Sequence, residues 1–292
     1  MDGYLLQLLV TGLAMGSIYG LVALGFVLLV NSVNIVNFAQ GEFAMLGAFL
    51  IYSVATGAGL PFWAALPAVL VLGAGIGLVF ERLAYRPLRR EDLVTHLVAT
   101  LAASVLLRNL AQQIWGPVPY SFTEPFGDRV WKVGGVVILP QHVLILGVTA
   151  LLVGLLYVFF FHTRTGKMLR AASQDRQAAQ LLGIPVTRLG ALTFTLAAAL
   201  GALAGVLVAP VFFVNLDMGF VMGLKAFVAS IIGGWGSVPG AIAGGLVVGV
   251  VEVLAATYLS SQYKDAFAFL ILVLFLILLP RGIFGERIAD KA

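Results

Sequence analysis

Nine stretches of almost purely apolar sequence divide this chain and leave little of it for a polar surface. The stretches cover residues 5–30, 43–57, 61–80, 94–114, 141–161, 189–213, 219–235, 238–258 and 265–280. Only 10% of the 292 residues are charged and 61% are hydrophobic, whereas about a quarter of a soluble protein is charged. Such a chain cannot surround its core with polar side chains, so the lipid bilayer is its solvent.

The lengths of these stretches predict an all-α, polytopic transmembrane helix bundle of eight to ten membrane segments. Several stretches are shorter than the ~20 residues that a straight transmembrane helix needs, so we expect broken, tilted or re-entrant helices among them. The sequence has no soluble domain and no low-complexity linker, and we expect a single transmembrane domain over residues 1–292. Its main polar connections are the segments 115–140 and 162–188.

The basic residues predict the orientation of the bundle. Three segments contain 12 of the 17 lysines and arginines: Arg82, Arg86, Arg89 and Arg90, then Arg164, Lys167, Arg170, Arg176 and Arg188, then Arg281, Arg287 and Lys291. The positive-inside rule assigns all three segments to the cytoplasm and segment 115–140 to the outside. Nine crossings satisfy this arrangement, with the N-terminus outside and the C-terminus inside. No basic patch is interleaved with exposed aromatic residues, so nucleic acid is not an expected partner.

The longest polar stretch runs from Phe161 to Leu189 and has the pattern of an amphipathic helix. Thr165 is placed to cap its start, and Gly183 followed by Ile184-Pro185 ends it. Apolar residues recur between these limits at helical spacing: Met168, Ala171, Ala172, Ala178, Ala179 and Leu182. A helix of this kind beside a membrane, with a stripe of alanines, is suited to contact a partner protein.

Motifs for catalysis and for ATP binding are missing. No lysine lies in a GxxxxGK[ST] loop, and the three histidines form no HExxH motif. In the segment 234–240, Ser237 directly follows a glycine, so the GxSxG spacing of a hydrolase nucleophile is not met. The chain has no cysteine, which excludes disulfides and thiolate metal sites. We therefore expect neither an enzyme nor a resident cofactor.

A polar, helix-breaking run separates the first two apolar stretches. Asn34, Asn37, Gln40 and Glu42 lie in it, and non-helical backbone at membrane depth occurs only where it is buried or lines a cavity. These residues are candidates for a translocation path or its gate. The alternative is an ordinary interfacial turn, with Glu42 at the positive end of the following helix.

Two further positions are candidates for the path. Trp235 lies in a glycine-rich segment that is either a hinge or a tight connection. Glu252 lies in an apolar stretch and needs a partner there, for which Lys225 and Arg108 are candidates. The Glu252 carboxylate is then part of either a structural ion pair or a transport site. Lys225 and Asp217 could instead be solvated near the outer surface.

These motifs resemble the membrane subunits of ABC importers for branched-chain amino acids, in particular the H-type of the two related permeases. The resemblance covers essentially the whole chain. It rests on Asn34–Glu42 followed by Met45–Ala48, on Glu81–Leu88, on Gly166–Ala172 with Asp175, Ala178 and Leu181–Ile184, and on Gly233–Ala241. The polar loop departs from the pattern in one respect: it lacks a full Glu-Ala-Ala opening and has Arg170-Ala-Ala172 instead.

The resemblance implies a permease that works only in an assembly. Its partners would be a second, homologous permease in the bacterial inner membrane, two cytoplasmic ATPase subunits that bind ATP, and a periplasmic substrate-binding protein. The substrates would be leucine, isoleucine and valine, moved into the cytoplasm by alternating access. Two alternatives remain open: a urea, short-amide or sugar permease of the same superfamily, and an autonomous ion-coupled transporter.

The resemblance also assigns a role to the polar segment 162–188. Its helix would be the coupling helix that contacts an ATPase subunit. The contacting residues would be Arg170, Ala171, Ala172, Asp175, Arg176, Ala178, Ala179, Leu182 and Gly183.

Overall fold

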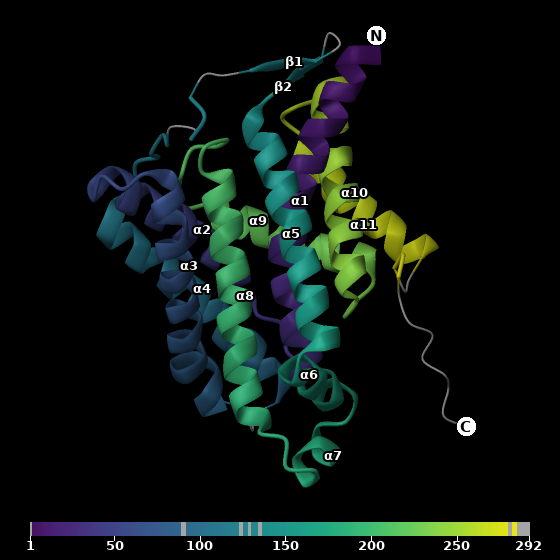
Figure 1. Cartoon of the computed structure of the whole chain (residues 1–292). Coiled ribbons are helices and arrows are strands. Elements are labelled where there is room, and N and C mark those ends of the chain that lie inside the picture. The colour runs from purple at the N-terminus through teal and green to yellow at the C-terminus, as the bar shows by residue number, and fades with distance from the viewer. Residues whose placement is uncertain are drawn as a thin grey trace.

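Long helices arranged side by side build the protein (Figure 1). A computed structural model describes residues 2–88, 92–122, 125–127, 130–133, 136–279 and 282–284. Within these residues, six helices are long and apolar enough to cross a membrane, over Gly3–Val33, Phe62–Leu88, Leu93–Trp115, Pro140–His162, Val186–Val208 and Val238–Tyr258. The prediction of an all-α, polytopic membrane protein is confirmed.

The nine apolar stretches correspond to nine helices. These are α1 (Asp2–Val33), α2 (Gln40–Tyr52), α3 (Phe62–Phe80), α4 (Leu93–Trp115), α5 (Pro140–His162), α8 (Val186–Val208), α9 (Met218–Gly233), α10 (Val238–Tyr258) and α11 (Lys264–Leu278). Three of them, α2, α9 and α11, have 13, 16 and 15 residues and are shorter than the ~20 residues of a straight span. A π-helical turn, Ser53–Gly57, extends α2, and a second one, Glu81–Tyr85, continues α3 into the 3-10 turn Arg86–Leu88.

Helix α1 is the centre of the bundle. The most apolar part of this helix is 89% buried, and the helix packs against α5, α8, α9 and α10. Glycines make the contact with α10 possible: a Cβ atom on Gly16 would lie 2.6 Å from the Cα atom of Leu246, and one on Gly249 would lie 2.4 Å from the Cα atom of Gly16. Close approach of backbones through small residues is how helices associate in lipid.

Helix α2 begins halfway through the bundle, after a break in the chain's helical structure. Residues 34–39 are not helical, and Asn34 is the one described non-glycine residue with a positive φ, at 55°. The Gln40 side chain donates to the carbonyl of Ala197 at 2.9 Å, and Glu42 Oε1 accepts from Ser104 Oγ at 2.9 Å. Ala197 and Ser104 are each the twelfth residue of a 23-residue helix, α8 and α4.

The two ends of the bundle differ in character (Figure 1). At one end lie the start of α1 and a hairpin of β1 (Trp131–Val133) and β2 (Val136–Ile138). At the other lie α6 (Arg164–Gln174) and α7 (Arg176–Leu181), which we call the basic end because the arginines and lysines of 162–188 gather there. The predicted basic residues Arg89, Arg90, Arg281, Arg287 and Lys291 lie outside the described residues.

A short segment after α11 is attached to the end of α9. The backbone N–H groups of Ile283 and Phe284 donate to the carbonyls of Ile232 and Gly233 at 2.9 and 2.8 Å. The last carbonyls of a helix have no partner within the helix, so residues 282–284 supply partners that α9 itself lacks.

Candidate functional site

The broken segment between α1 and α2, residues 34–39, and the first turn of α2 carry three buried polar side chains. Asn37 and Gln40 are 0% exposed and Glu42 is 1% exposed. Each has one polar atom engaged: Gln40 and Glu42 form the bonds to α8 and α4 described above, and Asn37 Oδ1 accepts from the backbone N–H of Ala39 at 3.1 Å. Neighbouring helices thus hold Gln40 and Glu42 in place, and the backbone of the segment itself holds Asn37.

The second polar atom of each of these side chains is unpaired. Among the described residues, no group hydrogen-bonds to Asn37 Nδ2, Gln40 Oε1 or Glu42 Oε2. Leaving a buried polar group without a partner costs about 1–3 kcal/mol, and more for a charged one. One donor and two acceptors left free within six residues therefore mark a candidate site for a polar substrate.

Helix α9 closes over this segment without side chains between the backbones. A Cβ atom on Gly41 would lie 2.0 Å from the carbonyl oxygen of Gly219, and one on Gly219 would lie 2.5 Å from Glu42 Oε2. The segment lies halfway along α4 and α8, which argues against an ordinary turn at the membrane interface. Glu42 does lie in the first turn of α2, as the alternative of an interfacial turn expected. The segment is sealed in this conformation, so a substrate could pass only if α2 and α9 moved apart.

The structure places the other predicted path residues in three different surroundings. Asn34 is exposed at the basic end. Trp235 is 43% exposed between α9 and α10, and its ring meets Phe227, which in turn contacts Phe38 on the broken segment, with centroid distances of 5.6 and 5.8 Å. Trp235 thus lies near the broken segment, whereas Glu252 belongs to a separate group.

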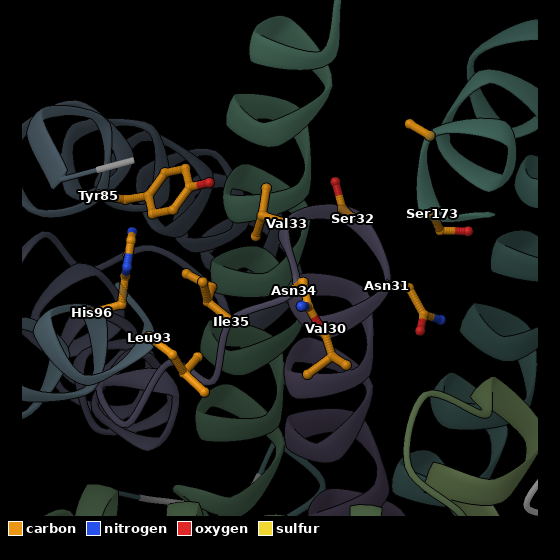
Figure 2. Close-up of a pocket in the computed structure, with 11 residues that line it drawn as sticks. Val30, Asn31, Ser32, Val33, Asn34, Ile35, Tyr85, Leu93, His96 and Ser173 are labelled. Carbon is orange, nitrogen blue, oxygen red and sulfur yellow. The ribbon is translucent and has the colours of Figure 1, made fainter. Parts of the chain in front are cut away.

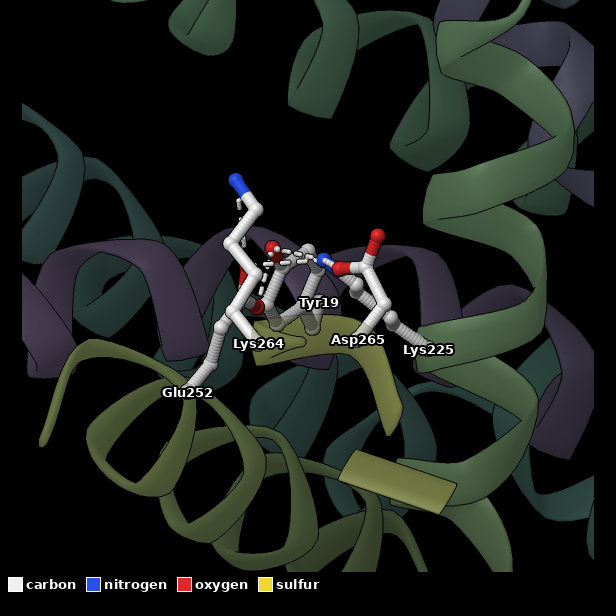
Figure 3. A network of polar contacts seen from close by, with 5 residues as sticks. All are labelled: Tyr19, Lys225, Glu252, Lys264 and Asp265. Carbon is white, nitrogen blue, oxygen red and sulfur yellow. Dashed lines mark hydrogen bonds and ion pairs between the residues drawn. The ribbon is translucent and has the colours of Figure 1, made fainter. Parts of the chain in front are cut away.

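Glu252 is part of a network of charges in which Glu252 and Lys225 are buried and Lys264 and Asp265 are partly exposed (Figure 3). Its carboxylate accepts from Lys225 Nζ at 2.7 Å and from the Tyr19 hydroxyl at 2.8 Å. Lys225 also contacts Asp265 Oδ1 at 2.7 Å, and Lys264 Nζ lies 3.9 Å from Glu252 Oε1. Two cations face two anions, so the network carries no net charge, which is typical of a structural ion-pair cluster.

Two expectations about these charges need correction. Lys225 is 3% exposed and not solvated, because Glu252 and Asp265 compensate its charge inside the bundle. Arg108, the other suggested partner of Glu252, pairs with Asp217 instead. Tyr19, Lys264 and Asp265 were not predicted as members of this network. Lys264 precedes the last apolar stretch and Asp265 is its first residue, so both look like ordinary boundary residues in the sequence.

The polar segment 162–188 forms two helices, not the single predicted one. Thr163, not Thr165, caps α6, with its hydroxyl accepting from the backbone N–H of Gly166 at 3.0 Å. Asp175 interrupts the helix in an extended conformation and caps α7, accepting from the N–H groups of Gln177 and Ala178 at 2.9 Å. An aspartate competes for backbone N–H groups, which explains the break. The predicted stop at Gly183 is confirmed by its φ of 79°.

The predicted contact residues of this segment divide into an inner and an outer set. Ala172 and Ala179 are buried against Leu169, Val186 and Leu189 of the chain itself. The outer set is exposed: Arg170, Ala171, Asp175, Ala178, Leu182 and Gly183. The side chain of Arg176 lies outside the described part. Leu181 and Leu182 are 89% and 82% exposed, and the prediction omitted Leu181. Two leucine side chains are thus exposed at the tip of the basic end.

Comparisons with known proteins cover nearly the whole chain. The family model described as "Branched-chain amino acid transport system / permease component" matches residues 8–276. The chain is 34% identical to the high-affinity branched-chain amino acid transport system permease protein LivH of Escherichia coli K12, covering 99% of this chain and 98% of that protein. It is 37% identical to BraD of Pseudomonas aeruginosa, which has the same description, over 98% of this chain and 97% of the relative.

A sugar permease is a more distant relative. The fructose import permease protein FruG of Bifidobacterium longum is 28% identical over 69% of this chain and 62% of its own length. The match of the family model to nearly the whole chain, together with two relatives above 30% identity, decides the family. The chain belongs to the permease components of branched-chain amino acid transport systems.

Proposed function

We propose that this chain moves leucine, isoleucine and valine into the bacterial cytoplasm as one permease subunit of an ATP-driven importer. The observation that carries this proposal is its similarity over almost the full length to LivH and BraD, both described as branched-chain amino acid permeases. The chain itself contains no ATP-binding motif, so separate ATPase subunits would bind ATP and supply the energy.

In this proposal the broken segment is the core of the path. The free polar atoms of Asn37, Gln40 and Glu42 would exchange hydrogen bonds with the ammonium and carboxylate groups of a passing amino acid. Trp235, near Phe38 at one end of the segment, would act in the gate. Glu252 would stabilise the bundle through its ion pairs and would not meet the substrate.

The segment of α6 and α7 would be the coupling element. Its outer set and the exposed Leu181 and Leu182 form a surface that a cytoplasmic ATPase could cover. Its inner residues, Ala172 and Ala179, anchor it to the bundle, so movement of a bound ATPase would reach α1 and α5. A mechanical link of this kind is what alternating access requires.

The remaining parts of the assembly belong to the same proposal. The N-terminus would face outward and the basic end inward, in the inner membrane. A second, homologous permease would complete the path, and a periplasmic binding protein would deliver the substrate. Together with the six long helices, the three short helices α2, α9 and α11 would make nine membrane segments, which lies within the eight to ten that the sequence predicts.

A sugar permease is the second candidate, favoured by the similarity to FruG. Reconstitution in liposomes separates the two. The complete importer, with its sister permease, ATPases and binding protein, is expected to accumulate radiolabelled leucine only when ATP is supplied to the ATPases. Accumulation of ribose or fructose, with no accumulation of leucine, would show that the transported substrate is a sugar and not an amino acid. Leucine uptake by this chain alone, driven by a sodium or proton gradient, would contradict the importer altogether.

A further inference from the structure

A cavity of about 600 Å³ opens at the basic end, beside the start of the broken segment (Figure 2). The end of α1, the turn at Tyr85, the start of α4 and the α6 helix form its walls. Figure 2 shows Tyr85 and His96 on one side, Asn31 and Ser173 on the other, and Asn34 between them. Pockets for small ligands typically measure about 300–1,000 Å³, so the cavity has room for one.

His96 lines this cavity and carries an unused hydrogen-bond acceptor. The ring is 5% exposed, and its Nδ1 atom lies 2.8 Å from the backbone carbonyl oxygen of Asp92. A carbonyl can only accept, so Nδ1 carries the proton, and Nε2 of the neutral ring is an acceptor. Nε2 is buried and has no partner among the described residues. A ligand with a hydrogen-bond donor would satisfy it.

The other walls limit the charge of that ligand. Asn31 is fixed by its amide, which donates to the carbonyl of Gly236 at 2.7 Å, leaving its side-chain oxygen as a second acceptor. Asn34 contributes a side-chain amide. None of the described lining residues is an aspartate, glutamate, lysine or arginine, and several are aliphatic, including Val30 and Leu93. Among the described lining residues a ligand with a net charge would find no counterion, whereas a zwitterion with an aliphatic body fits both kinds of wall.

We propose that this cavity binds a free aliphatic amino acid from the basic side of the membrane. The ammonium group donates to His96 Nε2, the Asn34 amide donates to the carboxylate, and the side chain lies against Val30 and Leu93. The inference rests on the proposed function, because the importer releases such molecules on this side. The occupant would contact both the bundle and α6, through Ala172 and Ser173.

A single introduced thiol can report occupancy, because the chain contains no cysteine. Ser173→Cys is nearly isosteric and places an exposed thiol in the cavity wall. In the purified full chain, leucine is expected to slow the reaction of this thiol with a maleimide. The matched reporter Ala178→Cys, which is exposed on α7 outside the cavity, is expected to react at the same rate with and without leucine.

Variants of the cavity then test the assigned contacts. Adding His96→Phe to the Ser173→Cys chain removes the acceptor and is expected to raise the leucine concentration needed for protection about tenfold. His162→Phe, an exposed histidine at the same end of α5, is the control and is expected to change nothing. If His96→Phe fails to elute as a folded species, Asn34→Gly serves instead, because glycine keeps the positive φ and removes the amide.

The outcomes separate this inference from the proposed function. Leucine uptake by the complete importer without protection of Ser173→Cys by leucine, isoleucine or valine would overturn the inference alone. Equal protection in the His96→Phe and His162→Phe chains would also overturn it. Protection by urea or ribose only would show that the site takes a different ligand. Protection by leucine without uptake of leucine would support the site and contradict the transported substrate.

Discussion

At the scale of single residues, Lys225 shows how a charge is kept inside the bundle. Replacing it by methionine would leave the carboxylate of Glu252, which is 6% exposed, without its closest cation. Breaking a buried ion pair from one side costs about 3–5 kcal/mol, and we expect Lys225→Met to lower the stability of the chain by this amount. Thermal unfolding of the detergent-purified chain measures the change.

The double variant Lys225→Met/Glu252→Leu is the control for this prediction. It removes both charges, and Lys264 remains available to Asp265 in the first turn of α11. Replacing a whole buried pair by apolar groups is often neutral, so most of the lost stability should return. A double variant no more stable than the single one would mean that the lysine acts through something other than its ion pairs.

Gly41 gives a second prediction at this scale. A Cβ atom there would lie 2.0 Å from the carbonyl of Gly219, so Gly41→Ala would force α2 away from α9 and cost about 1–3 kcal/mol. Gly75 in α3 has nothing within 4 Å of a Cβ atom, and Gly75→Ala should stabilise the chain by about 0.5–1 kcal/mol. Melting temperatures of the two variants should therefore move in opposite directions, and a shift in the same direction would refute the packing argument.

At the scale of elements, α7 depends on one cap. It has six residues, and Asp175 accepts from two of its N–H groups. Loss of an N-cap costs about 0.5–2 kcal/mol, which is enough to loosen so short a helix. We expect Asp175→Ala to speed hydrogen exchange at 177–182 and slow leucine uptake by the importer. Asp175→Asn keeps the cap and should restore both, whereas failure to restore uptake would point to a role of the charge.

The exposed leucines of the same segment test its partner. Because Leu181 and Leu182 are 89% and 82% exposed, replacing both by serine should leave the melting temperature of the chain unchanged. The same change should weaken co-purification of the ATPase subunits, since it removes apolar area from the proposed contact. As a control, serine at the equally apolar Leu151, which is 63% exposed in the middle of α5, should leave co-purification intact. Unchanged co-purification of the double variant would remove the coupling assignment.

Elements marked by a long apolar stretch could be predicted from the sequence, whereas short breaks and contacts between distant segments could not. Nine apolar stretches were enough to locate nine helices, because burial in lipid needs no knowledge of neighbours. The break at Asp175 was missed, since the alanine pattern continues through it and the capping bonds are local competitors of the helix. The depth of α2 could not be predicted, because contacts with α4 and α8, far away in the chain, determine it.

The residues of the candidate site also differ in whether the sequence could predict them. The polar run that contains Asn37, Gln40 and Glu42 was visible because it interrupts apolar sequence. The assembly of Tyr19, Lys225 and Asp265 around Glu252 was not, because it joins four helices from both ends of the chain. His96 gave no signal at all, since a lone histidine matters here only through the cavity that surrounds it.

At the scale of the whole molecule, the proposed orientation has a direct test. Ser121 is exposed in the segment between α4 and the hairpin, and Ser173 is exposed at the basic end. In intact cells, a membrane-impermeant maleimide should label Ser121→Cys, and should label Ser173→Cys only after the membrane is permeabilised. The chain has no other thiol, so each signal comes from one position. The reverse labelling pattern would show that the bundle has the opposite orientation in the membrane.

The attachment of residues 282–284 to α9 has a practical consequence for protein engineering. Fusion tags and truncations are usually placed after the last long helix, on the assumption that the residues beyond it are dispensable. Removing Ile283 and Phe284 would expose the carbonyls of Ile232 and Gly233, next to the connection that carries Trp235. A reporter protein joined directly after α11 would therefore disturb a segment close to the proposed gate, while one joined beyond Phe284 would leave these bonds in place.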